Sequence, residues 1–87
     1  MFFYFAMPYY VYILRSLSTG SFYIGHTSNL EDRLIRHNGG RVKYTRGRGP
    51  WELVVYKEFN SRSEAMRWES RLKKKSREEA IRLLSEL

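Results

Sequence analysis

Four side chains that could bind or protonate a phosphate stand at positions that a small fold could bring together: Tyr12, Tyr23, Arg33 and His37. The two tyrosines fall in aromatic and β-branched runs that predict two strands of one hairpin. Arg33 and His37 are four residues apart in a helical pattern and so share a helix face. A guanidinium grips phosphate oxygens, and phenol and imidazole groups carry protons, so this pattern indicates a phosphate site.

Each of these side chains also has an ordinary interpretation. Tyrosines are common in strands, and seven occur in this chain, so either one alone is more often a packing residue. An arginine on a helix is usually solvated. A histidine in a last helical turn, as His37 is, can simply complement the helix dipole as a cation.

Glu69 stands within the apolar stripe of a predicted helix, among Ala65, Met66, Trp68 and Leu72. A carboxylate in such a place must be paired, neutralised or bound to a cation, because desolvating it alone is prohibitive. Two interpretations remain open. Glu69 either forms a structural salt bridge with Arg33 or ligates one Mg²⁺ or Mn²⁺ ion, which needs few protein carboxylates when phosphate oxygens supply other ligands.

A polar, glycine-rich loop covers residues 39–50, and the stretch from Arg41 to Trp51 interleaves four cations with two aromatic rings, Tyr44 and Trp51. Its expected nucleic-acid contacts are Lys43, Arg46 and Arg48. Positive charge beside stackable rings tracks a nucleic-acid backbone without reading bases, although a merely solvated basic loop is an equal alternative. Gly25 ends a strand run where a side chain would crowd a close approach, and His26 follows it. Both are added to the expected nucleic-acid surface.

The composition supports a polyanionic partner. The 87 residues carry 16 Lys+Arg against 9 Asp+Glu, a formal net charge of +7, which favours nucleic acid and DNA first. The absence of cysteine excludes disulfides and thiolate chemistry and suits a cytoplasmic location. Residues 1–7 are apolar but too short to span a bilayer, so we expect no membrane association. They are interpreted as an extension before a single domain over 8–87, with Met7 as an alternative start, or as aromatics that pack on the domain or on a second copy.

The element order predicts an α+β domain, β-β-α-β-α-α, in which helices pack on a three-stranded antiparallel sheet. Strands are expected at 9–14, 22–25 and 51–59, the last with Val54 and Val55 as its most buried part. The first helix is expected over about 29–38, opened by a capping box of Ser28 and Glu31 and stopped by Gly39. Ser61 opens a helix to about Lys75. Ser76 opens a last helix with an apolar side of four residues: Ala80, Ile81, Leu84 and Leu87.

The motif Tyr10-Val11-Tyr12, ten further residues and then Tyr23-Ile24-Gly25, followed by Arg33, His37 and Glu69 in order, resembles the GIY-YIG nuclease superfamily. The resemblance covers essentially residues 9–84 and is nearest to its small stand-alone bacterial branch. It departs from the usual motif at Tyr10, where a glycine is common.

The resemblance implies a metal-dependent endonuclease that hydrolyses DNA phosphodiester bonds, directed by DNA structure rather than sequence, in repair or recombination. It places Tyr12 and Tyr23 at the general-base end, Arg33 on the scissile phosphate, His37 in proton transfer and Glu69 on one divalent cation. Two alternatives remain: a non-catalytic nucleic-acid-binding module, and a nuclease subunit that needs a protein partner, since so small a domain offers little recognition surface.

Overall fold

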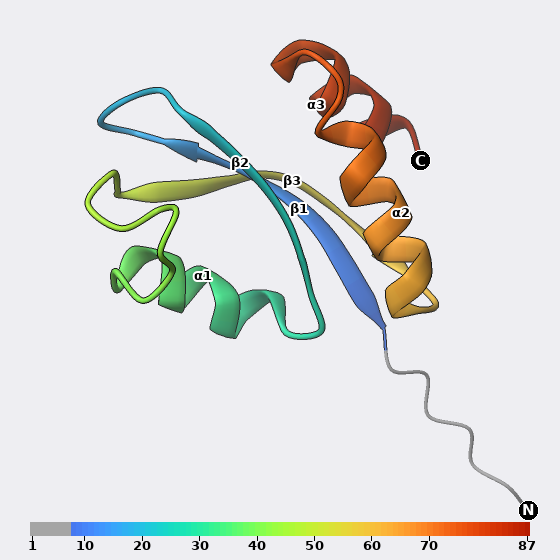
Figure 1. Ribbon diagram of the computed structural model, residues 1–87, viewed down its shortest axis with the longest axis horizontal. Helices are drawn as coiled ribbons and strands as arrows, with labels where there is room; N and C mark the ends of the chain where they lie inside the picture. The colour runs from blue at the N-terminus through green and yellow to red at the C-terminus, as the bar shows by residue number, and fades with distance from the viewer. Residues whose placement is uncertain (1–7) are drawn as a thin grey trace, which may run out of the picture.

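The computed structural model describes residues 8–87, in which three antiparallel strands and three helices follow one another in the expected order (Figure 1). The strands are β1 (Tyr9–Ser16), β2 (Phe22–Thr27) and β3 (Trp51–Phe59), and the helices are α1 (Leu30–Asn38), α2 (Arg62–Leu72) and α3 (Arg77–Glu86). The sheet order is β2-β1-β3. The α+β class and the β-β-α-β-α-α order are thus confirmed, whereas the proposed extension over 1–7 lies outside the described residues.

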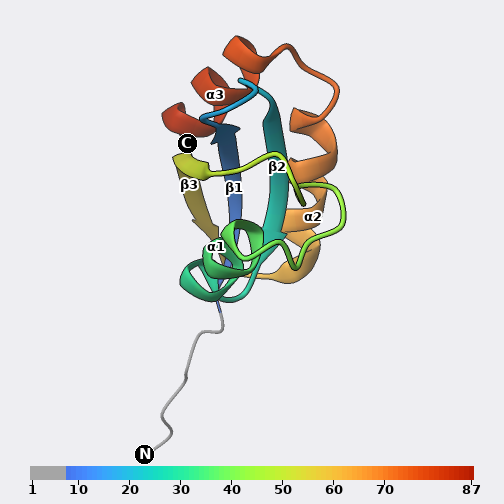
Figure 2. The same ribbon diagram turned by 90° about the vertical axis from the view of Figure 1, so that its left-hand side faces the viewer.

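The central strand β1 is covered on both faces of the sheet, which divides the core in two. Val11 and Ile13 point toward α2 and α3, and Tyr12 and Leu14 point toward α1 and Trp51. All four β1 side chains are at most 1% exposed. Figure 2 shows α1 and the loop after it on one face, with α2 and α3 on the other. The alternation of a strand therefore delivers Tyr12 to the α1 face.

The third strand has its predicted bounds, but its most buried residues are Trp51 and Phe59 at the ends, not Val54 and Val55, which are half-buried. The register explains the difference. Ile13 pairs with Val55 and Leu14 with Leu53, so Val54 is an extra residue in β3. A bulge of this kind interrupts the alternation, and both valines pack at the edge of the α2–α3 core.

The helix caps follow local sequence closely. Ser61 and Ser76 accept hydrogen bonds from the backbone N–H groups three residues on, as predicted. The predicted N-cap of α1 is wrong by one position, because Asn29 and not Ser28 accepts the hydrogen bond from the N–H of Asp32. Gly39 ends that helix, as expected.

One helix end and the exposure of two apolar residues also differ from prediction. Helix α2 ends at Leu72 rather than near Lys75. Met66 and Leu87, predicted on apolar faces, are 44% and 50% exposed, because their helices press only Ala65, Leu72, Ala80 and Leu84 fully into the core. No helix among residues 8–87 is long and apolar enough to cross a membrane.

The loop over 39–50 holds no helix or strand, as predicted, yet it is anchored at both ends. Asn38 accepts from the Trp51 N–H at 2.7 Å through Oδ1 and donates through Nδ2 to the Trp51 carbonyl at 3.1 Å. The Ser18 hydroxyl donates to the Arg48 carbonyl at 3.1 Å, and Ser16 also donates to it. The loop is therefore held against α1 and the β1–β2 turn.

Candidate active site

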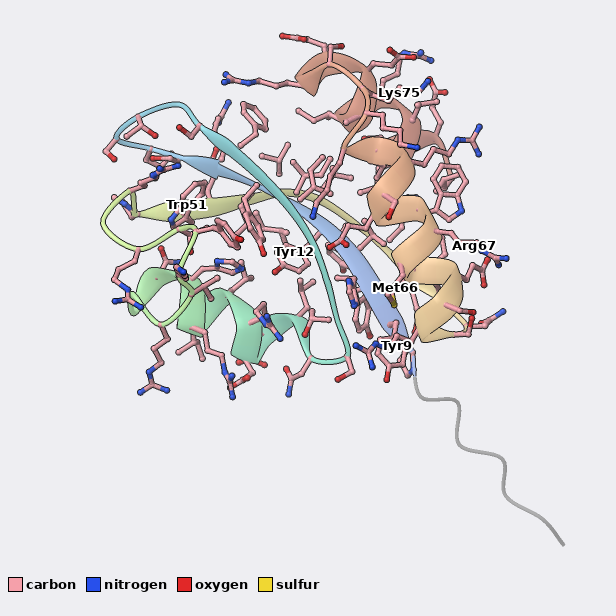
Figure 3. The ribbon with its side chains drawn as sticks, viewed as in Figure 1. Tyr9, Tyr12, Trp51, Met66, Arg67 and Lys75 are labelled. Carbon is pink, nitrogen blue, oxygen red and sulfur yellow. The ribbon has the colours of Figure 1, made fainter. Side chains whose placement is uncertain are left out.

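The site is built around two tyrosine rings and a histidine ring. Figure 3 shows one of them, Tyr12, between the sheet and α1. The Tyr23 and His37 ring centroids are 4.8 Å apart, and those of Tyr12 and Tyr23 are 6.2 Å apart. The hairpin register pairs Tyr12 with Gly25, and a Cβ atom on Gly25 would lie 2.7 Å from the Tyr12 hydroxyl oxygen. Gly25 is thus buried, and the structure gives it a packing role.

Strand β2 does not end at Gly25 as predicted but continues to Thr27. The missing side chain makes room for the Tyr12 ring without interrupting the ladder. His26 consequently lies within the strand and points to the opposite face, toward α2.

His37 is 2% exposed and its two ring nitrogens are both hydrogen-bonded. The Tyr12 hydroxyl lies 2.8 Å from Nε2, and the Thr45 hydroxyl oxygen lies 2.8 Å from Nδ1. Because the Thr45 hydroxyl donates to the Val42 carbonyl at 3.4 Å, its oxygen is left to accept from Nδ1–H. The imidazole Nε2 then accepts a hydrogen bond from the Tyr12 hydroxyl, which fixes one tautomer.

Thr45 is the residue that sequence reasoning missed. It lies in the glycine-rich loop, is 1% exposed, and its carbonyl accepts from the Trp51 indole N–H at 3.0 Å. The local sequence Tyr44-Thr45-Arg46 carries no pattern that marks the middle residue as buried. Only the hydroxyl type, eight residues after His37, could have suggested a partner for the imidazole.

Burial sets the protonation state of the cluster. It raises the pKa of Tyr12 and of Tyr23, and the charge of Glu69 raises both further while Arg33 lowers both. Burial, with Arg33, lowers the pKa of His37 to about 4. At neutral pH all three rings are therefore uncharged, which is incompatible with the interpretation of His37 as a dipole-complementing cation.

Arg33 and His37 both face the sheet from α1, as their spacing predicts. Arg33 is half-buried and lines a small polar pocket with His26 and Arg62. Its positive charge acts on both tyrosines and on His37. The four side chains that were expected to form one site are thus brought together.

Glu69 approaches from the other face of the sheet and does not pair with Arg33. Its side chain is 17% exposed; Oε1 lies 3.2 Å from His26 Nδ1, and Oε2 lies 3.8 Å from Lys73 Nζ. Of the two interpretations of Glu69, the salt bridge to Arg33 is therefore wrong, because α2 packs on the face of β2 from which His26 projects, opposite Arg33's helix.

The three loop cations Lys43, Arg46 and Arg48 are all exposed, and they surround the buried Thr45. Arg48 lines a groove beside Tyr23. The loop therefore presents positive charge to solvent next to the tyrosines, whereas His26 is engaged with Glu69.

Comparison with known proteins agrees with this geometry. Residues 8–82 match the family model described as the GIY-YIG catalytic domain. The chain belongs to the GIY-YIG family. Membership implies a nuclease-type activity, and the stretch matched contains every residue of the site described above.

Similar proteins of comparable length are found in bacteria and archaea. UPF0213 protein OB0043 of Oceanobacillus iheyensis is 49% identical over 77 residues, covering 87% of this chain and 88% of its own. UPF0213 protein NP_0776A of Natronomonas pharaonis is 43% identical over 82 residues, covering 93% and 95%. The solution NMR structure of UPF0213 protein BH0048 from Bacillus halodurans is 46% identical with a TM-score of 0.55, covering 91% and 84%. The chain is thus similar to small stand-alone GIY-YIG proteins.

GIY-YIG nucleases generally use a divalent metal, and Glu69 fits such a role in part. Within residues 8–87 no three His, Asp or Glu side chains gather as a metal-binding group. A single carboxylate nevertheless suffices for Mg²⁺, which retains waters and takes substrate phosphate oxygens as ligands. The Glu69 carboxylate is partly accessible and offers the hard oxygen ligands that such a cation prefers, and His26 Nδ1 and Lys73 Nζ lie beside its two oxygens.

Proposed function

We propose that this GIY-YIG protein is a divalent-metal-dependent endonuclease that hydrolyses phosphodiester bonds of DNA. The observation that carries the proposal is the cluster of Tyr23, Tyr12 and His37 beside two opposite charges. The Tyr23 ring centroid lies 4.8 Å from that of His37 and 6.2 Å from that of Tyr12. Arg33 from α1 and Glu69 from α2 both act on the two tyrosines. A phosphate there would meet a cationic group, a phenol and a metal-binding carboxylate together.

Tyr23 is the tyrosine that a substrate can reach. It is half-buried and lines the groove beside the loop, whereas Tyr12 is fully buried behind it. In hydrolysis a water oxygen forms a bond to phosphorus as the water gives up a proton, and the bond from phosphorus to the 3′-oxygen breaks, leaving an alkoxide that takes a proton from solvent. We assign Tyr23, as its phenolate, to accept the proton of the attacking water.

His37 serves this arrangement as a hydrogen-bond acceptor and not as the final base. A group with a pKa of about 4 is a weak base at neutral pH, but its uncharged Nε2 holds the Tyr12 hydroxyl in place. Thr45 in turn holds Nδ1–H. The three residues form a rigid support on which the Tyr23 ring rests.

Tyr23 needs a lower pKa to take a proton, because burial and Glu69 both raise it. Arg33 lowers the pKa of Tyr23, and we assign its guanidinium to a phosphate oxygen, where its charge would stabilise the transition state. When bound at Glu69, Mg²⁺ or Mn²⁺ would supply Lewis-acid stabilisation and replace a negative neighbour of the phenol by a positive one.

The loop cations Lys43, Arg46 and Arg48 support DNA as the substrate and contact with its backbone rather than its bases. Recognition by DNA structure, as in repair or recombination, follows from that mode of contact. A cytoplasmic location and a protein partner that targets the domain belong to the same proposal.

The test compares wild type with Glu69→Gln and with Glu58→Gln, a matched change at an exposed position of β3. Each is incubated with labelled linear, nicked, flapped and branched DNA in Mg²⁺, Mn²⁺ or EDTA. We expect cleavage by wild type and Glu58→Gln that EDTA stops, and at least a 100-fold loss with Glu69→Gln while gel-shift binding is kept. Cleavage that persists in EDTA, or none by wild type on any substrate, would contradict the proposal.

A further inference from the structure

A groove of about 680 Å³ crosses the free edge of β2 and joins the two faces of the sheet beside Tyr23. One wall is formed by the loop, through Tyr44 and Arg48, and the other by the end of α2 and the start of α3, through Lys73 and Arg77. Figure 2 shows β2 running between this loop and α2. The groove thus leads directly to the proposed reacting group.

The groove carries positive charge on both walls. Arg48 stands on the loop side, and Lys73 and Arg77 stand on the helical side, while none of its described lining residues is acidic. Arg77 is held in place, since its guanidinium carbon lies 5.1 Å from the Phe22 ring centroid and Nη1 donates to the Gly20 carbonyl at 3.3 Å. Cations that face each other across a groove suit a chain of phosphates.

The same groove offers aromatic faces to its occupant. Tyr44 is 73% exposed and projects from a loop that is otherwise polar, and the half-buried Tyr23 and Phe22 follow along β2. The bases of a double helix have their faces covered by their neighbours in the stack. Unpaired bases, whose faces are free, can therefore stack on aromatic rings in a basic groove, whereas the bases of a duplex cannot.

We propose that this groove binds a single-stranded segment of polynucleotide, with phosphates on Arg48, Lys73 and Arg77 and a base stacked on Tyr44. The proposal rests on the proposed nuclease function and deepens it, because it names the substrate class: nucleic acid with an unpaired strand next to the scissile bond. Lys73, whose Nζ lies 3.8 Å from Glu69 Oε2, becomes a phosphate contact in this proposal.

The test measures binding in EDTA, so that it does not depend on cleavage. Fluorescein-labelled oligothymidylate, oligouridylate and a DNA duplex of equal length are titrated with wild type, Tyr44→Leu and Tyr44→Phe. The charge test compares Arg48→Ala/Arg77→Ala with Arg67→Ala/Arg82→Ala, which removes equal charge away from the groove; Figure 3 shows Arg67 on the outer side of α2. Circular dichroism verifies that every variant is folded.

Wild type is expected to bind the single strands more tightly than the duplex. Tyr44→Leu should weaken single-strand binding at least about fivefold, which corresponds to the loss of one stacked base, and Tyr44→Phe should not. Arg48→Ala/Arg77→Ala should make the salt dependence shallower by about 1.4 in slope, for two phosphate contacts, and the control pair should leave it unchanged. The DNA and RNA arms show which sugar is preferred.

Equal affinity for duplex and single strand, or identical binding by Tyr44→Leu and wild type, would overturn the proposal. The binding and cleavage assays together test the groove proposal and the proposed nuclease function separately. Single-strand binding that depends on Tyr44 without any cleavage supports the groove and refutes the nuclease, whereas metal-dependent cleavage with no effect of Tyr44 supports the nuclease and refutes the groove.

Discussion

Replacing Thr45 by valine should destabilise the fold by removing one hydroxyl from the support beneath the tyrosines. Valine keeps the shape of threonine, but it leaves the Nδ1–H of His37 without the acceptor that now lies 2.8 Å away. Both residues are at most 2% exposed, so water does not replace the lost partner. An unsatisfied buried donor costs about 1–3 kcal/mol.

A loss of about 2 kcal/mol should lower the urea midpoint by roughly 1–2 M, when the denaturant slope of a small domain is about 1–2 kcal/mol/M. Urea unfolding at pH 7.5, followed by circular dichroism, measures it. Thr45→Ser is the control, since it retains the hydroxyl and should recover most of the loss. Nitrogen NMR of the His37 ring should report Nδ1–H in wild type and in the serine variant. A valine variant as stable as wild type, or a serine variant as unstable as the valine variant, would refute this account of the support.

Three further changes test other parts of the structure. Gly25→Ala should lower stability by about 1–3 kcal/mol in a thermal or urea melt, because the new Cβ would lie 2.7 Å from the Tyr12 hydroxyl; unchanged stability would mean that the rings move aside at no cost. The pKa of His37 is lowered from 6.5 to about 4, so the unfolded chain binds the extra proton and stability falls as pH drops through that window, by about 3 kcal/mol at most. Urea midpoints from pH 7 to 4 should show this component in wild type and lack it in His37→Gln; parallel curves would contradict it. Asn38→Ala should cost about 1–2 kcal/mol in the same assay, since it removes two hydrogen bonds to the Trp51 backbone, and an unchanged midpoint would show that water replaces them.

Local signals in the sequence were sufficient for most of the fold. Ser61 and Ser76 cap their helices because a cap depends on a hydrogen bond three residues away, within the reach of local sequence. Ser28 and Asn29 are both good N-cap residues and stand next to each other, so local sequence does not distinguish them. In the structure Asn29 is the N-cap. The inward valines of β3 could not be ranked from sequence, because a register shift in pairing with β1 is a property of two strands.

The site was predicted less completely than the fold. Helical spacing correctly placed Arg33 and His37 on one face, and the resemblance to GIY-YIG nucleases supplied the tyrosines and Glu69 as a set. The alternative in which Glu69 pairs with Arg33 was wrong because the sequence does not say that α1 and α2 cover opposite faces of the sheet. Thr45 was missed because its contact with His37 depends on how an irregular loop folds back.

The loop between α1 and β3 joins two environments across a single peptide bond: Tyr44 is 73% exposed and its neighbour Thr45 is 1% exposed. A swing of this loop away from the sheet would withdraw Thr45 from His37 and admit water to the imidazole. In water the ring recovers its ordinary proton affinity, and a protonated ring resists being buried again. Closing such an opened loop would release that proton, so mildly acidic solution would favour the open form.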